Sequence, residues 1–257
     1  MRYVGRLRNV GLAVLVVGAG VLASAEPALA AAVRVPDRVA DRVPERPALT
    51  ESDIAASNEK IRQAYGALAL MWSAEFKKAG TKFVTPAIVR YRGNVRTECG
   101  VMPANNAQYC PSRNAIFFDE VFVAGMAKAA SNALGTDGDM AAVGVIAHEM
   151  GHAVAIQLGE TSEIPYENEA AADCLAGAFA QRSERDGSLE KGDLDEAFWG
   201  MASAGDPTPQ LTGYRRLDQR IMLRAAVLGH GTREQRLASF RAGYSQGAGA
   251  CVETLRS

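Results

Sequence analysis

Apolar residues recur with a helical period through most of the chain after residue 50. Between Ser52 and Ala79 they fall at three- and four-residue intervals, which predicts a long amphipathic helix with Ser52 as its N-cap and Gly80 as its stop. The same periodicity predicts further helices at residues 120–133, 138–158, 166–184, 191–204 and 232–246.

Two segments are instead typical of strands. Residues 82–92 alternate and are rich in β-branched and aromatic types, and Pro86 suits an edge position or a bulge. Residues 115–119, AIFFD, predict a second strand. We therefore expect one mainly helical α+β domain over residues 51–257, with a small β-sheet before the 138–158 helix.

The first 50 residues predict a targeting signal followed by a linker. Residues 1–9 carry three arginines and no acid, residues 10–22 are apolar, and small residues follow. This pattern indicates a secretory signal peptide over residues 1–30, cut after Ala30 or, as a second candidate, after Ala25. The alternative is an uncleaved anchor, but the apolar run is short for a span of roughly 20 residues. Residues 31–50 alternate Arg, Asp, Pro and Val and predict an extended or disordered linker.

Composition and charge exclude several classes of protein. The 257 residues are 48% hydrophobic and 22% charged, which is a globular composition. The formal net charge is −1, so we expect neither nucleic acid nor a general attraction to anionic lipid. Once the signal is removed, we expect no stable membrane span in the mature form and a secreted or extracytoplasmic location in the cell envelope.

The four cysteines are Cys99, Cys110, Cys174 and Cys251. An even number in an exported chain favours disulfides, and the absence of C-x-x-C disfavours a cysteine zinc site. Four cysteines allow three connectivities, which sequence cannot rank. A local Cys99–Cys110 bridge would close the Gly/Pro/Asn-rich stretch between them and would leave Cys174 with Cys251.

The candidate chemistry lies in residues 143–158, VGVIAHEMGHAVAIQL. A helix turns every 3.6 residues, so His148 and His152 share one face and can bind one metal ion. Glu149 lies about 100° round the helix, where it can reach a metal-bound water without being a ligand. This is the H-E-x-x-H pattern of zinc proteases, in which the metal lowers the pKa of its water and the glutamate takes the proton. Gly151 costs helix stability, which indicates close approach of another segment.

A catalytic zinc needs a third protein ligand. A histidine six residues beyond His152 is absent, because residue 158 is leucine, so the metzincin pattern fails. A glutamate on the next helix is the alternative. Glu163 and Glu167 compete with Glu169, but only Glu169 shares a face with Asp173, which could orient a ligand histidine. We therefore expect one Zn²⁺ on His148, His152 and Glu169.

His230 is the third and last histidine of the chain. It could donate a hydrogen bond to the oxyanion of a tetrahedral intermediate, with Tyr166, Tyr214 and Tyr244 as alternative donors. The simpler interpretation is a turn before a helix, with Thr232 as N-cap and a capping box closed three residues later. Both can hold. We expect Arg233 and Arg236 on the surface or in ion pairs, and a turn at residues 206–209.

Four ordered blocks resemble the bacterial putative neutral zinc metallopeptidase family. They are the HExGH motif at His148–His152, the E-x-x-A-D-C-x-A-G segment at Glu169–Gly177, the HGTxxQR block at His230–Arg236, and the cysteine loop with its following strand at Cys99–Asp119. The resemblance covers residues 84–257. It implies a zincin-like fold and a zinc-dependent peptidase with a gluzincin-like ligand arrangement.

These observations predict an exported zinc metallopeptidase that hydrolyses peptide or protein substrates through a zinc-bound water activated by Glu149. Two alternatives remain: a non-catalytic binding domain stabilised by zinc, and a zinc amide hydrolase acting on a non-peptide substrate. A structural site needs a fourth ligand and no base, so Glu149 favours the enzyme. A substrate peptide could lie alongside the strand at 115–119 by β-augmentation.

Overall fold

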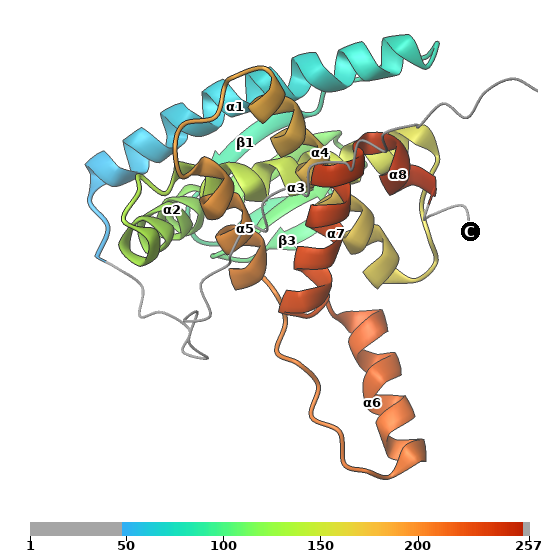
Figure 1. Cartoon of the computed structure of the whole chain (residues 1–257). Helices are drawn as coiled ribbons and strands as arrows, with labels where there is room; N and C mark the ends of the chain where they lie inside the picture. Colours follow the sequence, from blue (N-terminus) through green and yellow to red (C-terminus); the bar gives the residue numbers. More distant parts are fainter. Residues whose placement is uncertain (1–47, 254–257) are drawn as a thin grey trace, which may run out of the picture. The chain divides into compact units, whose positions relative to one another are not determined.

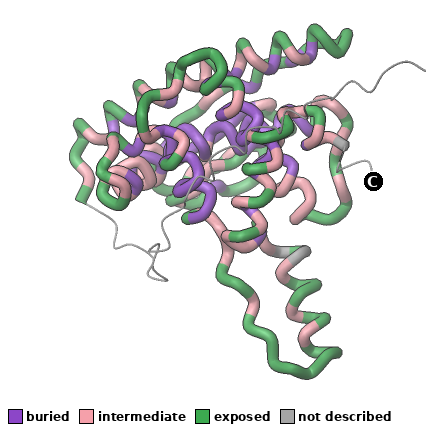
Figure 2. Tube along the Cα trace, in the orientation of Figure 1, coloured by how far each residue is buried: buried purple, intermediate pink, exposed green. Residues whose placement is uncertain are grey.

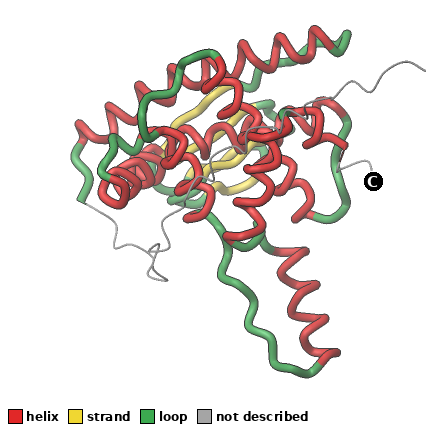
Figure 3. Tube along the Cα trace, in the orientation of Figure 1, coloured by secondary structure: helices red, strands yellow, loops and turns green. Residues whose placement is uncertain are grey.

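The computed structural model describes residues 48–253, drawn in colour in Figure 1. Its helices are α1 (Glu51–Lys78), α2 (Glu120–Leu134), α3 (Asp139–Leu158), α4 (Pro165–Arg185), α5 (Asp193–Ser203), α6 (Arg215–Leu228), α7 (Arg233–Gln246) and α8 (Ala248–Glu253). Its strands are β1 (Ala87–Tyr91), β2 (Val95–Thr97), β3 (Gly100–Met102), β4 (Ala107–Cys110) and β5 (Ala115–Asp119). The domain is α+β and mainly helical, as the sequence predicted (Figure 3). The predicted signal peptide and all but the last three residues of the predicted linker lie outside the described residues.

The cap of the first helix lies two residues before the predicted one. Thr50, rather than Ser52, is the N-cap of α1, and its side chain accepts a hydrogen bond from the backbone N–H of Asp53. Asp53 in turn accepts from the Thr50 backbone N–H, which completes a capping box. The reciprocal pair explains the earlier start, because it satisfies two backbone donors where Ser52 would satisfy one.

The three-stranded sheet has the order β1–β5–β4, and β2 and β3 form a separate antiparallel hairpin. β5 occupies the predicted residues 115–119, but it is the central strand, parallel to β1 and antiparallel to β4. Both of its edges are therefore paired, and the expectation that a peptide lies alongside it is wrong. β4 and β1 are the edge strands, and Pro86 directly precedes β1, which is shorter than predicted.

The cysteine loop supplies three strands that the sequence analysis left out. β2, β3 and β4 are three or four residues long and lie among Gly, Pro and Asn residues, so no alternation could develop. A disulfide joins Cys99 to Cys110 and closes this segment. Tyr91, Met102 and Phe117 pack together beneath it in one buried cluster.

Helix α3 is the centre of the domain and packs against α1, α2, α4, α5 and the β4–β5 half of the sheet. It is long and apolar enough to cross a membrane, but 72% of that stretch is buried in the domain, which is typical of a core helix. Its N-terminus has no cap of its own, because Gly138 stands there with a φ of 83°. Glu196 of α5 supplies the cap: its buried carboxylate accepts hydrogen bonds from the N–H groups of Gly138 and Met140, each at 2.9 Å.

Helices α4 and α7 pack closely along their lengths. At Gly243 a Cβ atom would come within 1.7 Å of the Cys174 carbonyl oxygen, so only glycine allows this crossing. A second disulfide joins Cys174 of α4 to Cys251 of α8. The structure thus has the two bridges that the sequence analysis favoured.

Candidate metal centre

His148 and His152 lie one turn apart on α3, as the i, i+4 spacing predicts. Their Nε2 atoms are 3.2 Å apart and the rings meet edge to face. His148 is buried and His152 is half-buried. Both imidazoles therefore present the same ring nitrogen to one point in space.

Glu169 of α4 reaches the same point. Its two carboxylate oxygens lie 3.2 Å from Nε2 of His148 and 3.5 Å from Nε2 of His152. One of them, Oε2, is buried and has no hydrogen-bond partner among the described residues. The rivals lie elsewhere: Glu167 accepts a hydrogen bond from Ser162 at 2.5 Å, and Glu163 is exposed.

Gly151 permits α4 to come this close to α3. A Cβ atom at Gly151 would lie 2.7 Å from the backbone oxygen of Ala172 and 2.9 Å from its Cα atom. The expectation of a close approach at Gly151 is therefore confirmed. The missing side chain sets the distance between the helix that carries both histidines and the helix that carries Glu169.

Asp173 and Arg236 lie behind His148. Asp173 is fully buried, and its Oδ1 lies 2.7 Å from Nδ1 of His148. Arg236 of α7 holds both oxygens of that carboxylate, with Nη2 at 2.6 Å and Nε at 2.9 Å, and it also donates to the Ala204 carbonyl. Arg236 and Asp173 thus form a buried ion pair. Arg236 fixes the carboxylate that fixes the ring of His148.

The charges in this network are strongly interdependent. Burial alone would lower the pKa of His148, but Asp173 and Glu169 outweigh burial and raise it to about 10. Burial alone would raise the pKa of Glu169 and Asp173, but the imidazoles lower the first, and Arg236 and His148 lower the second. The two carboxylates thus favour a positive charge beside the imidazoles, which a proton or a metal cation can supply.

Glu149 is buried next to His148 and is held by the sheet. Its Oε2 accepts a hydrogen bond of 2.7 Å from the backbone N–H of Tyr109 in the edge strand β4. The other carboxylate oxygen has no hydrogen bond to any described residue. The backbone of β4 therefore orients Glu149 and leaves one oxygen free to act as a base.

His230 lies in the turn before α7, where it is exposed. Its Nδ1 is 3.8 Å from Asp206, and within residues 48–253 it makes no hydrogen bond or ion pair with the histidine–glutamate cluster. Thr232 is the N-cap of α7 and forms a capping box with Gln235, as predicted. The oxyanion role of His230 stays a prediction.

The alternative tyrosine donors differ in their surroundings. Tyr214 is exposed, and Tyr244 donates to Glu184 at 2.6 Å. Tyr166 lies in the first turn of α4, against Gly231, and burial and the nearby charge of Asp173 raise its pKa. Of the three alternative tyrosine donors, Tyr166 is therefore the one whose pKa is affected by a charged residue of the site.

The donor set fits zinc. Two imidazoles and a carboxylate are the ligands of catalytic zinc sites that keep one position open. One ligand atom from each of His148, His152 and Glu169 lies within 4.8 Å of the others, and the unpartnered Oε2 of Glu169 would gain a partner from a metal ion. Four more acidic side chains lie close together, at Asp137, Asp139, Asp193 and Glu196. In this cluster Asp139 forms an ion pair with Lys60, and Glu196 caps α3.

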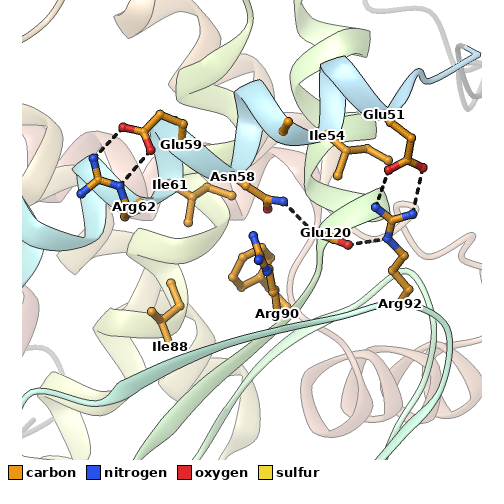
Figure 4. Close-up of a pocket in the computed structure, with 12 residues that line it drawn as sticks. Glu51, Ile54, Asn58, Glu59, Ile61, Arg62, Ile88, Arg90, Arg92 and Glu120 are labelled. Atoms are coloured by element: carbon orange, nitrogen blue, oxygen red, sulfur yellow. Dashed lines mark hydrogen bonds and ion pairs between the residues drawn. The ribbon is translucent and has the colours of Figure 1, made fainter.

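A separate cavity of about 560 Å³ lies between α1 and β1 (Figure 4). Arg92 pairs there with Glu51 and Glu120, and Arg62 pairs with Glu59. No residue of the histidine–glutamate cluster lines this cavity. It is an ion-paired groove, and we assign it no role in the chemistry of the cluster.

Comparison with known proteins agrees with this geometry. The sequence profile of the putative neutral zinc metallopeptidase family matches residues 6–255. Two curated relatives, both "Uncharacterized protein YpfJ" from strains of Escherichia coli, are 33% identical over 202 residues. The match covers 72% of this chain and 66% of theirs, slightly under two thirds of the relatives' length. No solved structure matches.

Proposed function

We propose that this chain, which belongs to the putative neutral zinc metallopeptidase family, hydrolyses peptide bonds with one zinc ion held by His148, His152 and Glu169. The observation that carries the proposal is the convergence of these three donors beside a buried glutamate with a free oxygen. Three donors and an adjacent base are what hydrolysis at a metal requires.

Each residue has a distinct part in the proposed reaction. When bound, zinc would supply Lewis acidity, lowering the pKa of a water ligand and polarising the scissile carbonyl. Glu149 takes the proton of the attacking water on the oxygen that Tyr109 leaves free, and later delivers it to the leaving amine. Asp173, held by Arg236, keeps the ring of His148 in place through Nδ1.

The sheet favours a peptide as substrate. β4 is an edge strand, and Tyr109 already directs its backbone N–H outward, towards Glu149. An extended peptide paired with this edge would pass directly beside the base. β4 thus replaces residues 115–119 as the strand on which a substrate would lie.

The exported location remains part of the proposal. The bridges Cys99–Cys110 and Cys174–Cys251 support a compartment outside the cytoplasm, where disulfides persist. They agree with the signal peptide predicted over residues 1–30.

The structural-zinc alternative has less support. Such a site would need a fourth protein ligand, and the cluster in the described residues contains three. His230, which could have supplied the fourth ligand, is exposed, and its Nδ1 lies 3.8 Å from Asp206 rather than at the cluster.

The test is cleavage of a mixed peptide library by the zinc-loaded protein beside Glu149→Gln, with zinc content measured for both. Loss of a general base costs about 10²–10⁴-fold in rate, so we expect the variant to retain zinc and lose cleavage by at least that factor. Glu163→Gln is the matched control, because Glu163 is exposed and near the site in sequence, and it should cleave like the parent.

Two results would count against the proposal. If parent and variant both hold zinc and neither cuts, the peptidase function is wrong. If Glu169→Gln binds zinc as tightly as the parent, the ligand set is wrong.

A further inference from the structure

Residues 207–229, here called the arm, differ from the rest of the domain. They comprise an irregular segment followed by α6, and none of the residues whose burial is described is buried (Figure 2). α6 packs mainly against α4. A 14-residue helix is marginal by itself in water, so its stability must come from contacts on its faces.

The arm is rich in exposed apolar side chains. It contains six of the twelve large hydrophobic residues that are exposed in the described part of the chain: Leu211, Tyr214, Leu217, Met222, Leu223 and Val227. Single exposed apolar residues are ordinary, but a concentration on one element marks an interaction surface.

The arm is also strongly basic. Four arginines, at positions 215, 216, 220 and 224, are exposed, and none makes a hydrogen bond or ion pair with a residue between 48 and 253. The only acid of the arm, Asp218, accepts hydrogen bonds from Thr212 and Gly213 and so is occupied at the start of the helix. The net charge of −1 for the whole chain conceals this local excess.

Both kinds of side chain share the outer face of α6. At about 100° per residue, Leu223, Arg216, Val227, Arg220 and Arg224 follow one another within an arc of roughly 100°. Ile221 and Ala225 lie on the opposite side and are half-buried. That inner side, through Met222 and Ala225, lines a cavity of about 360 Å³ that Leu211, Tyr166 and Thr232 also line. The apolar side chains of the outer face are therefore Leu223 and Val227.

We propose that the arm docks on an anionic lipid surface. Aliphatic side chains would enter the boundary between headgroups and acyl chains, and arginines that extend along them would reach phosphates. A lipid surface meets both requirements at once, whereas nucleic acid offers phosphates but no partner for Leu223 and Val227. The arm begins after Asp206, which forms a β-bridge with Thr232 at the start of α7. The proposal does not depend on peptidase activity.

The experiment places an environment-sensitive fluorophore on α6 of the full chain, through Leu223→Cys. The four native cysteines are disulfide-bonded, so the new thiol is the one that reacts. Leu70→Cys on α1 is the matched control, since Leu70 is also exposed. A local probe reports contact at α6 even if the apolar residues near the N-terminus bind vesicles independently.

We expect the emission of the α6 probe to shift to the blue with vesicles of phosphatidylcholine and phosphatidylglycerol at three to one, and the α1 probe to stay unchanged. Each arginine near an anionic surface contributes about fivefold in affinity, so Arg216→Gln, Arg220→Gln and Arg224→Gln together should weaken it on the order of 100-fold. Added salt should also weaken binding to the vesicles. Circular dichroism checks that the triple variant keeps its helices.

Four results would overturn the proposal. One is no shift at all, and another is an equal shift with pure phosphatidylcholine. A shift that grows with protein concentration without vesicles would make a second copy of the chain the occupant. An equal shift with polyglutamate would indicate an acidic protein partner.

Discussion

Helices α6 and α7 have the same length, 14 residues, and only four residues separate them. α7 packs along α4 and buries Arg236, Phe240 and Gly243, whereas α6 buries no described residue. Arg236 of α7 neutralises Asp173, whereas the arginines of α6 are exposed and make no hydrogen bond or ion pair with a described residue. The comparison teaches that an arginine can belong to the core when a buried acid faces it, while apolar side chains such as Leu217 and Leu223 can remain at the surface.

The largest effect is expected from removing the buried arginine of α7. Arg236→Met leaves the Asp173 carboxylate buried without its partner, which typically costs 3–5 kcal/mol, so we expect about that loss in the free energy of unfolding by urea titration. Zinc affinity, measured by chelator competition, should fall about 10- to 100-fold because His148 loses its fixed partner. Arg224→Met on α6 is the control and should change stability by less than about 0.5 kcal/mol. Similar losses for both variants would contradict the contrast.

The next effect compares two acidic side chains that accept backbone hydrogen bonds near the start of a helix. Glu196→Ala removes two buried hydrogen bonds to the start of α3 and should cost about 2–3 kcal/mol. Asp218→Ala removes the hydrogen bonds that Asp218 accepts from Thr212 and Gly213, just before α6, and should cost under about 1 kcal/mol, with faster hydrogen exchange confined to α6. Hydrogen exchange followed by mass spectrometry measures both, and global loss of protection in Asp218→Ala would show that the arm supports the domain.

Glycine substitutions should have opposite signs at two helical positions. Gly151→Ala forces α3 away from Ala172 and should destabilise the protein by about 1–2 kcal/mol. Gly66→Ala in α1 meets no atom within 4 Å and should stabilise it by about 1 kcal/mol through helix propensity. Thermal denaturation checks the pair. A stabilised Gly151→Ala variant would mean that the helix contact does not constrain the site.

The smallest effect depends on pH. Burial, reinforced by nearby Asp139 and Glu196, raises the pKa of Asp193 to about 6. Between the usual pKa of an aspartate and this raised value, the folded state binds a proton that the unfolded state has released. The contribution of Asp193 to the free energy of unfolding is therefore full below about pH 4 and is lost as the pH rises through 6. We expect Asp193→Asn, relative to the parent, to gain on the order of 1 kcal/mol between pH 4 and 7. A difference that stays constant with pH would contradict the shift.

The sequence predicted the parts of the fold in which period and burial agree. The strand at 115–119 and the bounds of α3 follow from unbroken apolar patterns, and helical geometry alone places His148 and His152 together. α6 was not among the predicted helices, although Leu217, Ile221 and Ala225 recur at helical spacing. The arginines and the exposed apolar residues Leu223 and Val227 between them obscured this stripe in the sequence.

Two charged side chains in the core show the limits of sequence reasoning: Arg236 forms an ion pair, as one of the two expectations had it, but its burial was not expected, and the role of Glu196 was missed. Arg236 belongs to the HGTxxQR block, and its position inside that block was the available signal. Glu196 directly precedes the buried run from Ala197 to Ala202, where an acid is unexpected. Neither partner could be foreseen, because the cap of α3 and the salt bridge to Asp173 join residues 56 to 63 positions apart.

Each disulfide lies next to a residue that orients a side chain of the proposed metal centre. Cys110 follows Tyr109, whose N–H holds Glu149, and Cys174 follows Asp173, which holds His148. Thiol reductants, often added during purification, would therefore remove the disulfides that support the positions of Glu149 and His148. Every proposed metal ligand would still be present in the chain. A preparation can contain all the residues of the site and still be inactive for this reason, so the protein is best purified without reductant before any activity is judged.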